Sequence, residues 1–276
     1  MKTVLDTILE DVRREVAEAK QATPPAELRL RLADAPPPRD FTAPLTTGFG
    51  LIAEIKERSP SVGPMRRENI RDAAAAYAAS PLVKAVSVLT NRTHFGMDIH
   101  RLAAIRSQVP QPILRKDFIV DAYQILEARA FGADAILLMA NVLDPQSMRE
   151  FHSLAGDLGM EVLFEVHTRE EIDTLPPTAR IVGINSRKFQ STTGFVSAGG
   201  SSGQDFSLDM DTFRLVEKLP PGAIRIAESG LTPATLPAVA LHFHAALVGT
   251  ALLRDPRGIL ACLKDFEQAT ISPGTC

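Results

Sequence analysis

Short apolar runs recur along the chain between residues 50 and 249, and longer segments with a helical period separate them. The eight runs cover residues 50–56, 85–90, 112–117, 134–139, 160–167, 180–185, 223–229 and 245–249. Short apolar runs predict buried strands, and strands that alternate with helices predict a parallel sheet. Eight such units fit a closed (β/α)8 TIM barrel. An open, doubly wound sheet is the alternative, but it more often has a G-x-G-x-x-G turn after its first strand, which is missing here.

The first residues follow a different pattern from the barrel units. Val4, Leu5, Ile8, Leu9 and Val12 have the spacing of an amphipathic helix. A proline-rich segment, residues 23–44, follows and predicts an irregular arm lying over the domain. We therefore expect an N-terminal helical extension over residues 1–48 that packs on the barrel, a barrel over 49–270 and a C-terminal tail over 271–276.

Composition narrows the function without identifying it. The chain has 276 residues, of which 45% are hydrophobic and 23% charged, with a formal net charge of −3. That charge gives no basic field for nucleic acid or an anionic membrane, and no apolar stretch reaches the length of a membrane span. Acidic and basic residues interrupt the N-terminal apolar positions, which argues against a signal peptide. We expect a cytoplasmic protein.

Charged residues gather where the predicted strands end. Glu54 and Lys56 close the first strand, Lys116 closes the third, Glu165 the fifth and Glu228 the seventh. Active sites of (β/α)8 barrels lie at the carboxyl ends of the strands, so these side chains should meet over one mouth. Any one of them alone could be a solvated or structural charge. Converging lysines and glutamates in a cleft are instead candidates for acid and base catalysis.

Two glycines near the end of the barrel predict a phosphate site. Gly230 and Gly249 come directly after the seventh and eighth apolar runs, and Ser59 follows the first. Glycine allows a ligand close to the backbone, and barrels often bind phosphate at these two loops. The alternative is that both glycines only make tight turns. We favour a phosphorylated ligand because the barrel makes the location specific.

The histidines and cysteines predict no metal site. His167 lies on the same strand face as Glu165 and is expected to be a hydrogen-bonded wall residue. His242 and His244 precede the eighth strand, at the opposite end of the barrel from the predicted site. Cys262 and Cys276 lack metal-ligand spacing, and we expect no metal and no disulfide.

Six ordered motifs resemble the indole-3-glycerol-phosphate synthase family of tryptophan biosynthesis. They are "IAEIKERSPSVG", "ILRKDFIVDAYQILEARAFGADAILLM", "VLFEVH", "GIN-S-R", "IAESG" and "ALVGTALL". The resemblance covers nearly the whole chain, including the N-terminal extension. It implies a carbon–carbon lyase that converts 1-(2-carboxyphenylamino)-1-deoxyribulose 5-phosphate to indole-3-glycerol phosphate, with loss of carbon dioxide and water. No metal or organic cofactor is implied.

The resemblance also implies roles for individual residues. Lys116 would be the general acid for ring closure, and Glu165 would assist proton transfer in the later dehydration. Lys56 would contribute there or bind the carboxylate, and the division of acid work between the two lysines stays open. The remaining implied site residues are Glu54, Asn185 and Glu228 for substrate hydroxyls and lysines, Arg187 and Ser229 for substrate, Ser59, Gly230, Gly249 and Thr250 for phosphate, and Phe95, Phe118, Leu137 and Met139 for the anthranilate ring.

Three segments depart from the family pattern. Asn185-Ser186-Arg187 lacks the second asparagine that the family usually has after strand six. Residues 190–206 form a long segment rich in serine and glycine, which is typical of a mobile or functional loop and predicts a mobile flap near the mouth. In "TNRTHFGMDIH", His94 replaces the first of two aromatics, and Phe95 fits the second.

These departures leave alternatives to the synthase. One is a divergent paralogue whose anthranilate ring carries a substituent. Another is a phosphoribosyl isomerase, which typically uses an Asp or Cys pair in place of lysines and Glu165. A third is a non-catalytic paralogue that binds a phosphorylated ligand. We expect a monomer, with contacts to neighbouring pathway enzymes as a further option.

Overall fold

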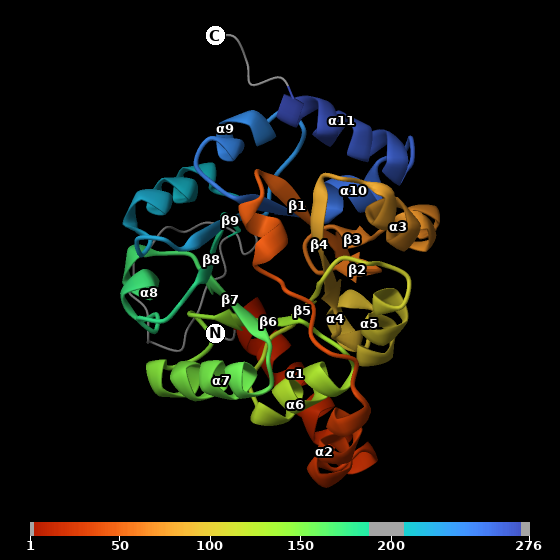
Figure 1. The fold of residues 1–276 in the computed structure, drawn as a ribbon, viewed down its shortest axis with the longest axis vertical. Coiled ribbons are helices and arrows are strands. Elements are labelled where there is room, and N and C mark those ends of the chain that lie inside the picture. Colours follow the sequence, from red (N-terminus) through yellow and green to blue (C-terminus); the bar gives the residue numbers. More distant parts are fainter. Residues whose placement is uncertain (1–2, 188–206, 272–276) are drawn as a thin grey trace.

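Eight parallel strands close into a barrel, as the apolar runs predict (Figure 1). The computed structural model describes residues 3–187 and 207–271. Around the barrel the strands follow the order β1-β10-β9-β8-β7-β6-β5-β4. Their bounds are β1 Gly50–Ile55, β4 Val83–Leu89, β5 Ile113–Lys116, β6 Ala135–Met139, β7 Glu161–Val166, β8 Ile181–Asn185, β9 Ile224–Glu228 and β10 Ala245–Val248. Each strand falls on one predicted run, so the predicted fold class is confirmed.

Helices ring the outside of the barrel (Figure 1). They are α3 Arg67–Ala79, α4 Arg92–Phe95, α5 Ile99–Arg106, α6 Ala122–Ala130, α7 Pro145–Asp157, α8 Arg169–Asp173, the 3-10 helix η2 Met210–Lys218, α9 Leu236–Ala240, α10 Thr250–Arg254 and α11 Ile259–Ile271. Local sequence sets their ends. The Asp144 side chain accepts hydrogen bonds from the backbone N–H groups of Gln146 and Ser147, and so caps α7 as its Asp-Pro start predicts. None of the helices in the described ranges is long and apolar enough to span a bilayer.

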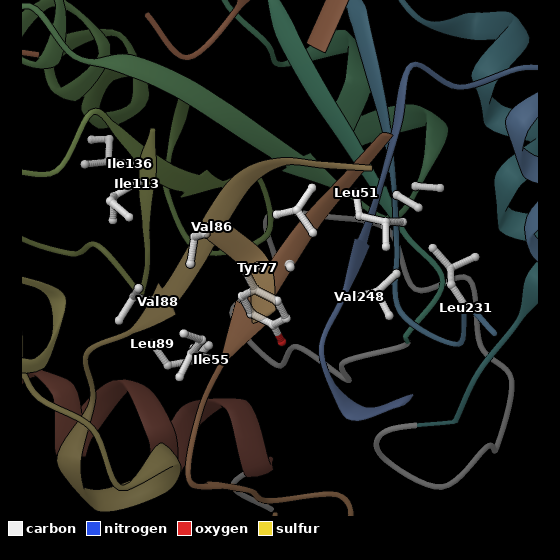
Figure 2. Close-up of a cluster of buried hydrophobic side chains, with 14 of the residues drawn as sticks. Leu51, Ile55, Tyr77, Val86, Val88, Leu89, Ile113, Ile136, Leu231 and Val248 are labelled. Atoms are coloured by element: carbon white, nitrogen blue, oxygen red, sulfur yellow. The ribbon is translucent and has the colours of Figure 1, made fainter. Parts of the chain in front are cut away.

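Alternation along each strand divides the apolar residues into two layers. On β1, Leu51 and Ile55 pack outward against the helices, in a cluster that includes the fully buried Tyr77 of α3 (Figure 2). Ile52 belongs instead to the cluster that fills the barrel interior. Side chains two residues apart share a face of a strand, so Glu54 lies on the interior side with Ile52. This parity aims the charged residue into the barrel.

The N-terminal extension forms two helices, α1 Val4–Ala22 and α2 Pro25–Asp34, followed by the 3-10 helix η1 Ala43–Thr46. Leu5, Ile8, Leu9 and Val12 are buried and belong to the same cluster as the barrel interior, which confirms the amphipathic helix. Val4 is the exception on this face, because it is 37% exposed.

The prediction of an irregular arm over residues 23–44 was wrong for residues 25–34, which form α2 with a proline in its first turn. The rest of the proline-rich arm crosses the amino-terminal ends of the strands. The backbone N–H of Arg39 donates to Asp134 Oδ1 at 2.7 Å, just before β6, and its guanidinium donates to the carbonyl oxygens of Val109 and Gln111, before β5. Phe41 and Leu45 are fully buried with the interior cluster. The arm therefore packs on the base of the barrel, opposite the predicted site.

A small hairpin follows β1. Its strands, β2 Arg58–Ser59 and β3 Gly63–Pro64, pair antiparallel. The Arg58 guanidinium donates to the carbonyl oxygens of Arg92 and Thr93 in α4, at 2.8 and 3.0 Å. The sequence pattern did not predict this hairpin, because strands of two residues have no period to detect. It holds Ser59 at the mouth.

Candidate active site

One cavity of about 370 Å³ opens at the carboxyl ends of the barrel strands, and all eight strands line it. Every residue of the predicted site lies on its wall. These residues are Glu54, Lys56, Ser59, Phe95, Lys116, Phe118, Leu137, Met139, Glu165, Asn185, Arg187, Glu228, Ser229, Gly230, Gly249 and Thr250. The fold thus brings together side chains that lie nearly two hundred positions apart in sequence, while their chemical roles stay predictions.

The end of β1 supplies an ion pair. Lys56 Nζ lies 2.5 Å from Glu54 Oε1, and both side chains are largely buried. Burial alone would raise the pKa of Glu54, but the charges of Lys56 and Lys116 outweigh it and the pKa is lowered. The Tyr77 hydroxyl donates to the Glu54 backbone carbonyl at 3.0 Å and fixes the strand at this point. Glu54 is therefore a carboxylate that faces two lysines.

Lys116, from β5, lies between two carboxyl groups on the far side of the barrel. Its Nζ is 3.2 Å from Glu165 Oε2 and 3.5 Å from Glu228 Oε2. Burial favours the neutral amine, but the charges of Glu165, Glu228 and Glu54 outweigh burial and raise the pKa of Lys116. Lys116 is therefore an ammonium group at neutral pH.

Glu165 and Glu228 are shifted in opposite directions. Burial raises the pKa of both carboxyl groups. For Glu165 the neighbouring charge of Lys116, contacts with His167 and a hydrogen bond from Asn185 Nδ2 at 3.0 Å outweigh burial, and the pKa falls below its usual range. For Glu228 burial and the negative charge of Glu165 raise the pKa to about 8. At neutral pH one carboxyl group is ionised and its neighbour is protonated.

This arrangement suits acid–base chemistry. A buried ammonium group can donate a proton to a developing oxyanion, and an ionised carboxylate beside it can accept one. Neighbouring titratable groups whose pKa values are pushed apart are the usual sign of such a pair. The cavity therefore holds an ammonium group, an ionised carboxylate and a protonated carboxyl group close to one another.

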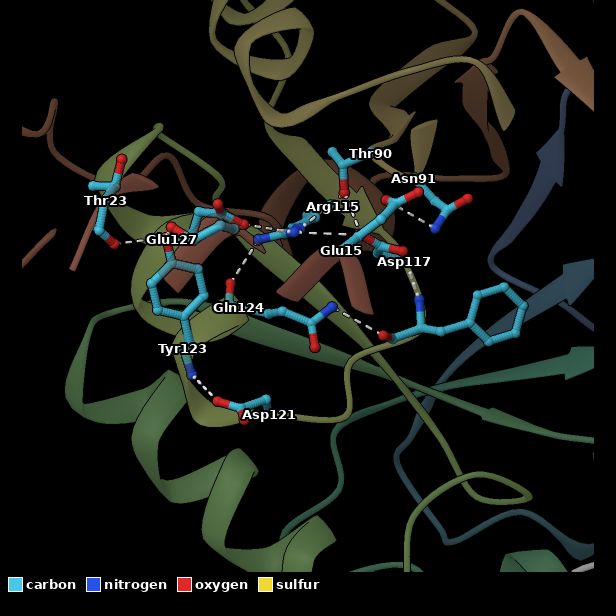
Figure 3. Close-up of polar contacts among 12 residues, drawn as sticks. Glu15, Thr23, Thr90, Asn91, Arg115, Asp117, Asp121, Tyr123, Gln124 and Glu127 are labelled. Carbon is cyan, nitrogen blue, oxygen red and sulfur yellow. Dashed lines mark hydrogen bonds and ion pairs between the residues drawn. The ribbon is translucent and has the colours of Figure 1, made fainter. Parts of the chain in front are cut away.

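The side chains on either side of Lys116 form a buried network (Figure 3), and Asp117 of this network also lines the cavity. Arg115 Nε donates to Thr90 Oγ1 at 2.9 Å, and its guanidinium pairs with Glu127 at 2.9 Å and with Asp117 at 3.3 Å. Asp117 Oδ1 accepts the backbone N–H of Phe118 at 2.9 Å. The side chains next to Lys116 are thus tied into one network, and Asp117 holds the backbone of Phe118 where no regular structure follows β5.

An apolar wall lies on one side of the cavity. The rings of Phe95 and Phe118 are stacked with centroids 6.4 Å apart and planes 23° apart. Leu137 and Met139 of β6 continue the wall. Ile8 of α1 also lines the cavity, and the sequence prediction missed this role because the helical period shows only that Ile8 is buried, not where.

The first helix is attached to the loop that carries Phe95. Glu15 of α1 accepts hydrogen bonds from Asn91 Nδ2 and from the backbone N–H and hydroxyl of Thr93 (Figure 3 shows the Asn91 bond). His94 Nε2 lies 2.9 Å from Asp11 Oδ2. His94 therefore faces α1. The family often has an aromatic residue at this position, whereas in this chain the residue contacts the N-terminal extension.

Small side chains and backbone form the opposite wall. Ser59 Oγ lies 2.9 Å from Ser61 Oγ in the β2–β3 hairpin, and both serines line the cavity. After β9, Ser229 has a φ of 69° and Gly230 a φ of 70°. A left-handed serine is sterically costly and is found most often at functional sites. This wall also includes Gly249 and Thr250, so it offers hydroxyl and backbone groups and no carboxylate.

Arg187 lies at the rim. Its backbone N–H donates to Asn185 Oδ1 at 2.9 Å, and Arg187 forms a β-bridge with Leu208. Burial lowers the pKa of the guanidinium, although Glu54 opposes the effect. The mobile flap predicted for residues 190–206 falls outside the described residues.

The other histidines divide into two cases. His244 Nδ1 accepts the backbone N–H of Arg225 at 3.0 Å, at the base of the barrel, which is a structural contact. His167 is held between Glu165 and Glu171, so its contacts reach a residue of the predicted site.

Fold and site together define a (β/α)8-barrel enzyme of acid–base chemistry. A family model described as indole-3-glycerol phosphate synthase matches residues 5–260. The chain belongs to the indole-3-glycerol phosphate synthase family, whose members are lyases of tryptophan biosynthesis that close a ring with decarboxylation.

Curated relatives support this assignment over the whole chain. An indole-3-glycerol phosphate synthase of a Nocardioides species is 39% identical over 276 residues, covering 96% of this chain and 99% of the relative. One from Salinibacter ruber is 39% identical over 240 residues, covering 85% and 84%. One from a Mycobacterium species is 40% identical over 269 residues, covering 95% and 93%.

Solved structures share the fold at low identity. A 3-hexulose-6-phosphate synthase from Salmonella typhimurium has a TM-score of 0.58 and 14% identity, covering 82% of this chain and all of the other. An N-(5'-phosphoribosyl)anthranilate isomerase from Pyrococcus furiosus has a TM-score of 0.53 and 12% identity, covering 81% and 98%. The family match therefore favours the synthase over the isomerase alternative.

Proposed function

We propose that the cavity of this chain converts 1-(2-carboxyphenylamino)-1-deoxyribulose 5-phosphate to indole-3-glycerol phosphate, with release of carbon dioxide and water. The observation that carries the proposal is the position of Lys116. Its ammonium group sits between an ionised and a protonated carboxyl group, beside an apolar wall.

The two walls suit the two ends of this substrate. Phe95, Phe118, Leu137 and Met139 would hold the anthranilate ring, because stacked and aliphatic side chains favour an aromatic face. Ser59, Gly230, Gly249 and Thr250 would hold the phosphate through hydroxyl and backbone groups, and Ser229 lies beside them. Arg187 at the rim supplies a positive charge near this end. The reacting carbons would then lie under the lysines.

Ring closure requires a proton at the ketone oxygen. The ring carbon that bears the carboxylate attacks the carbonyl carbon, and the oxygen takes a proton from the Lys116 ammonium to become a hydroxyl. The carbon–carboxylate bond then breaks, carbon dioxide leaves, and its bonding electrons return to the ring. Lys56 would stabilise the departing carboxylate by its charge.

Dehydration needs an acid for the hydroxyl and a base for the ring proton. We propose that Glu165 accepts the proton, because it is the ionised carboxylate nearest Lys116. One of the two lysines would protonate the leaving hydroxyl. Asn185, Glu54 and Glu228 would hold the substrate hydroxyls and the lysines in position. The chemistry as proposed uses side chains alone, without a metal or an organic cofactor.

We further propose that the enzyme acts in the cytoplasm as a monomer, and that contacts with neighbouring pathway enzymes remain an option. Residues 1–48 would act as an extension that completes the mouth, residues 49–270 as the barrel and 271–276 as a tail. The contacts of Ile8 and Glu15 support a shared site. A particle of 29.9 kDa in light scattering would agree with the monomer, and twice that mass would contradict it.

Lys116→Met tests the assignment of the acid. We expect turnover to fall by at least 10³-fold, because methionine keeps the apolar stem and loses the proton donor, which typically contributes 10²–10⁴-fold. Substrate affinity should change by less than about tenfold, since the walls are intact. Stopped assays that follow indole absorbance and carbon dioxide, together with calorimetric binding, measure both quantities.

Lys264→Met serves as the matched control, because Lys264 is exposed on α11 and remote from the cavity. It should keep full turnover. If Lys116→Met retained most of its rate, Lys116 would not be the acid. If the wild-type chain gave no indole product from this substrate, the proposed reaction would be wrong.

A further inference from the structure

His167 lies between two buried carboxyl groups that come from different elements. Its Nε2 is 3.3 Å from Glu165 Oε1 in the cavity, and its Nδ1 is 3.1 Å from Glu171 Oε2. Val166 between Glu165 and His167 packs outward, so the parity of the strand places both polar side chains on the same face. The imidazole thus links the predicted site to the first turn of α8.

Glu171 makes hydrogen bonds with the turn between β7 and α8 as well as with the His167 ring. Its Oε2 accepts the backbone N–H of His167 at 2.6 Å, and its own backbone N–H donates to Thr168 Oγ1, the N-cap of α8, at 3.2 Å. The Glu171 side chain is only 4% exposed. The backbone of the turn between β7 and α8 therefore holds the Glu171 carboxylate in addition to the ring.

Two carboxylates at the two ring nitrogens determine the charge of His167. An ionised carboxylate only accepts hydrogen bonds, and a neutral imidazole has a single N–H to donate. Only the doubly protonated ring offers a donor to both Glu165 and Glu171. Burial opposes this charge, but the contacts with Glu165 and Glu171 outweigh burial and raise the pKa of His167 to about 10.

The His167 ring contacts Glu165, the carboxylate that takes part in the proposed chemistry. Glu165 Oε1 faces His167 and accepts from Asn185, whereas Oε2 faces Lys116. These contacts leave the carboxylate little freedom to rotate. They also add a second positive charge beside it, which favours the ionised form.

We propose that His167 is a positioning residue for the reaction: an imidazolium, held by Glu171, that keeps Glu165 ionised and directs its second oxygen toward Lys116. This inference rests on the proposed role of Glu165. It assigns no proton transfer to His167, and it makes Glu171, which does not line the cavity, part of the same device.

The surrounding charges must be counted with the ring. Glu165 also faces Lys116 from β5 and Glu228 from β9, and Lys116 in turn is influenced by Glu54 from β1. On α8, Arg169 pairs with Asp173 at 3.1 Å, and both are half exposed or more, so they largely balance each other. His167 is therefore one of two cations in contact with Glu165, which makes its removal measurable.

Nitrogen NMR of the whole chain labelled at its six histidines gives a readout that does not depend on activity. The signals that disappear in His167→Asn identify the ring. We expect both of its nitrogens to be protonated at pH 8, at which an ordinary histidine is neutral. A singly protonated ring at pH 8 would overturn the inference.

The pH dependence of kcat/KM gives the second readout. His167→Asn keeps a polar side chain but removes the charge, so the pKa of Glu165 should rise and the acid limb of the profile should move to higher pH by roughly 1–3 units. Glu171→Gln should move it in the same direction by less, because the ring loses the anion that keeps it protonated. Since every variant uses the same substrate, ionisation of the substrate cancels in the comparison.

His152→Asn is the matched control. His152 is a partly buried histidine of α7 whose ring meets Phe164 edge-on at 5.1 Å, on the outer side of the barrel. It should leave the acid limb unchanged. An unchanged acid limb in both His167→Asn and Glu171→Gln would overturn the positioning role. If His167→Asn does not fold, Glu171→Gln and the wild-type NMR signals still decide the question.

Glu165→Gln separates this inference from the proposed function. Loss of turnover in Glu165→Gln combined with a normal profile in the His167 variant would remove the positioning role alone. Full turnover in Glu165→Gln would contradict the proposed function, whatever the charge of the ring.

Discussion

Gly183 of β8 faces the barrel axis. It pairs with Glu165 on β7 and with Ile226 on β9. A Cβ atom built there would lie 2.0 Å from Glu228 Oε1, which is closer than any real contact. The carboxyl group of Glu228 would have to move away from Lys116. A residue without a side chain therefore decides where a predicted active-site carboxyl group sits.

We expect Gly183→Ala to lower kcat by about tenfold or more with little change in the melting temperature, because the Glu228 side chain can move while the strand stays in place. When Gly183→Ala is combined with Glu228→Gln, the two losses in kcat should be less than additive, since both substitutions act on the contact between Glu228 and Lys116. Steady-state kinetics of the four proteins in this cycle measures the coupling.

Gly156→Ala is the control for this substitution. No atom lies within 4 Å of a Cβ at Gly156, which is helical, so the variant should be as active as the wild type and at least as stable. Fully additive losses in the cycle would mean that Gly183 does not act through Glu228.

Single residues show what the sequence could and could not predict. Charged residues at strand ends predicted Lys116 and Glu165, because strand parity and the barrel rule together fix where such side chains point. Gly183 was not predicted, because a glycine in a strand carries no sign of the neighbour that needs its space. His167 was predicted to be a wall residue, and the sequence could not show that Glu171 would reach its second nitrogen.

At the scale of elements, two buried ion networks lie at opposite ends of the same part of the barrel. Asp117 pairs with Arg115 after β5, at the mouth, and holds the Phe118 backbone. Asp134 pairs with Arg106 at 2.6 Å before β6, at the base, and accepts the backbone N–H of Ile113 at 2.7 Å. The two aspartates have similar burial and similar partners but differ in their distance from the cavity.

We expect Asp134→Asn to destabilise the fold by roughly 3 kcal/mol, because it removes the carboxylate paired with buried Arg106. Asp117→Asn should destabilise it less, because Arg115 keeps its ion pair with Glu127 and burial raises the pKa of Asp117. Only Asp117→Asn should also lower kcat by tenfold or more, since the end of β5 carries Lys116 and Phe118. Urea unfolding gives the stabilities, and turnover well below the unfolding transition gives the rates.

Equal effects of the two variants on kcat, after correction for the unfolded fraction, would show that the network at the mouth is structural only. A loss in Asp117→Asn confined to KM would instead place its effect on Phe118 and ring binding.

A helix or strand could be predicted where its own residues carry a regular apolar pattern. All eight strands followed from apolar runs, which are local signals. The β2–β3 hairpin and the attachment of α1 to the loop at Asn91 were missed. Both depend on contacts between segments that are distant in sequence, such as Glu15 with Asn91, and a single sequence does not show such pairings.

At the scale of the whole molecule, the N-terminal extension contacts both ends of the barrel. Ile8 reaches the cavity at the mouth, and Arg39 and Phe41 pack at the base. The sequence predicted that the arm lies over the domain, but not that one segment of the extension would line the cavity and the next would pack on the base. That division depends on contacts between the extension and distant segments of the barrel.

Buried protons make the stability of the whole chain depend on pH. Glu228, with a pKa of about 8, and His167, with a pKa of about 10, hold protons in the folded chain that the unfolded chain releases near pH 4.3 and 6.5. Their stabilisation is complete at low pH and is lost as pH rises through 8 and 10. The pKa values of Glu54 and Glu165 are lowered, so their contribution is present above the usual carboxyl range and is lost in acid.

The free energy of unfolding should therefore be greatest in mildly acidic solution and fall toward pH 9. Glu228→Gln replaces the protonated carboxyl group by an amide that cannot ionise, so it should match the wild type at pH 5. At pH 9 it should be more stable by on the order of 2 kcal/mol, because the wild type then carries a buried negative charge beside Glu165. Glu217→Gln, at an exposed position of η2, should follow the wild type at both values. Urea unfolding at pH 5 and pH 9 measures the free energy of unfolding of all three proteins. If this free energy differed between Glu228→Gln and wild type by the same amount at both pH values, Glu228 would keep no proton in the folded chain.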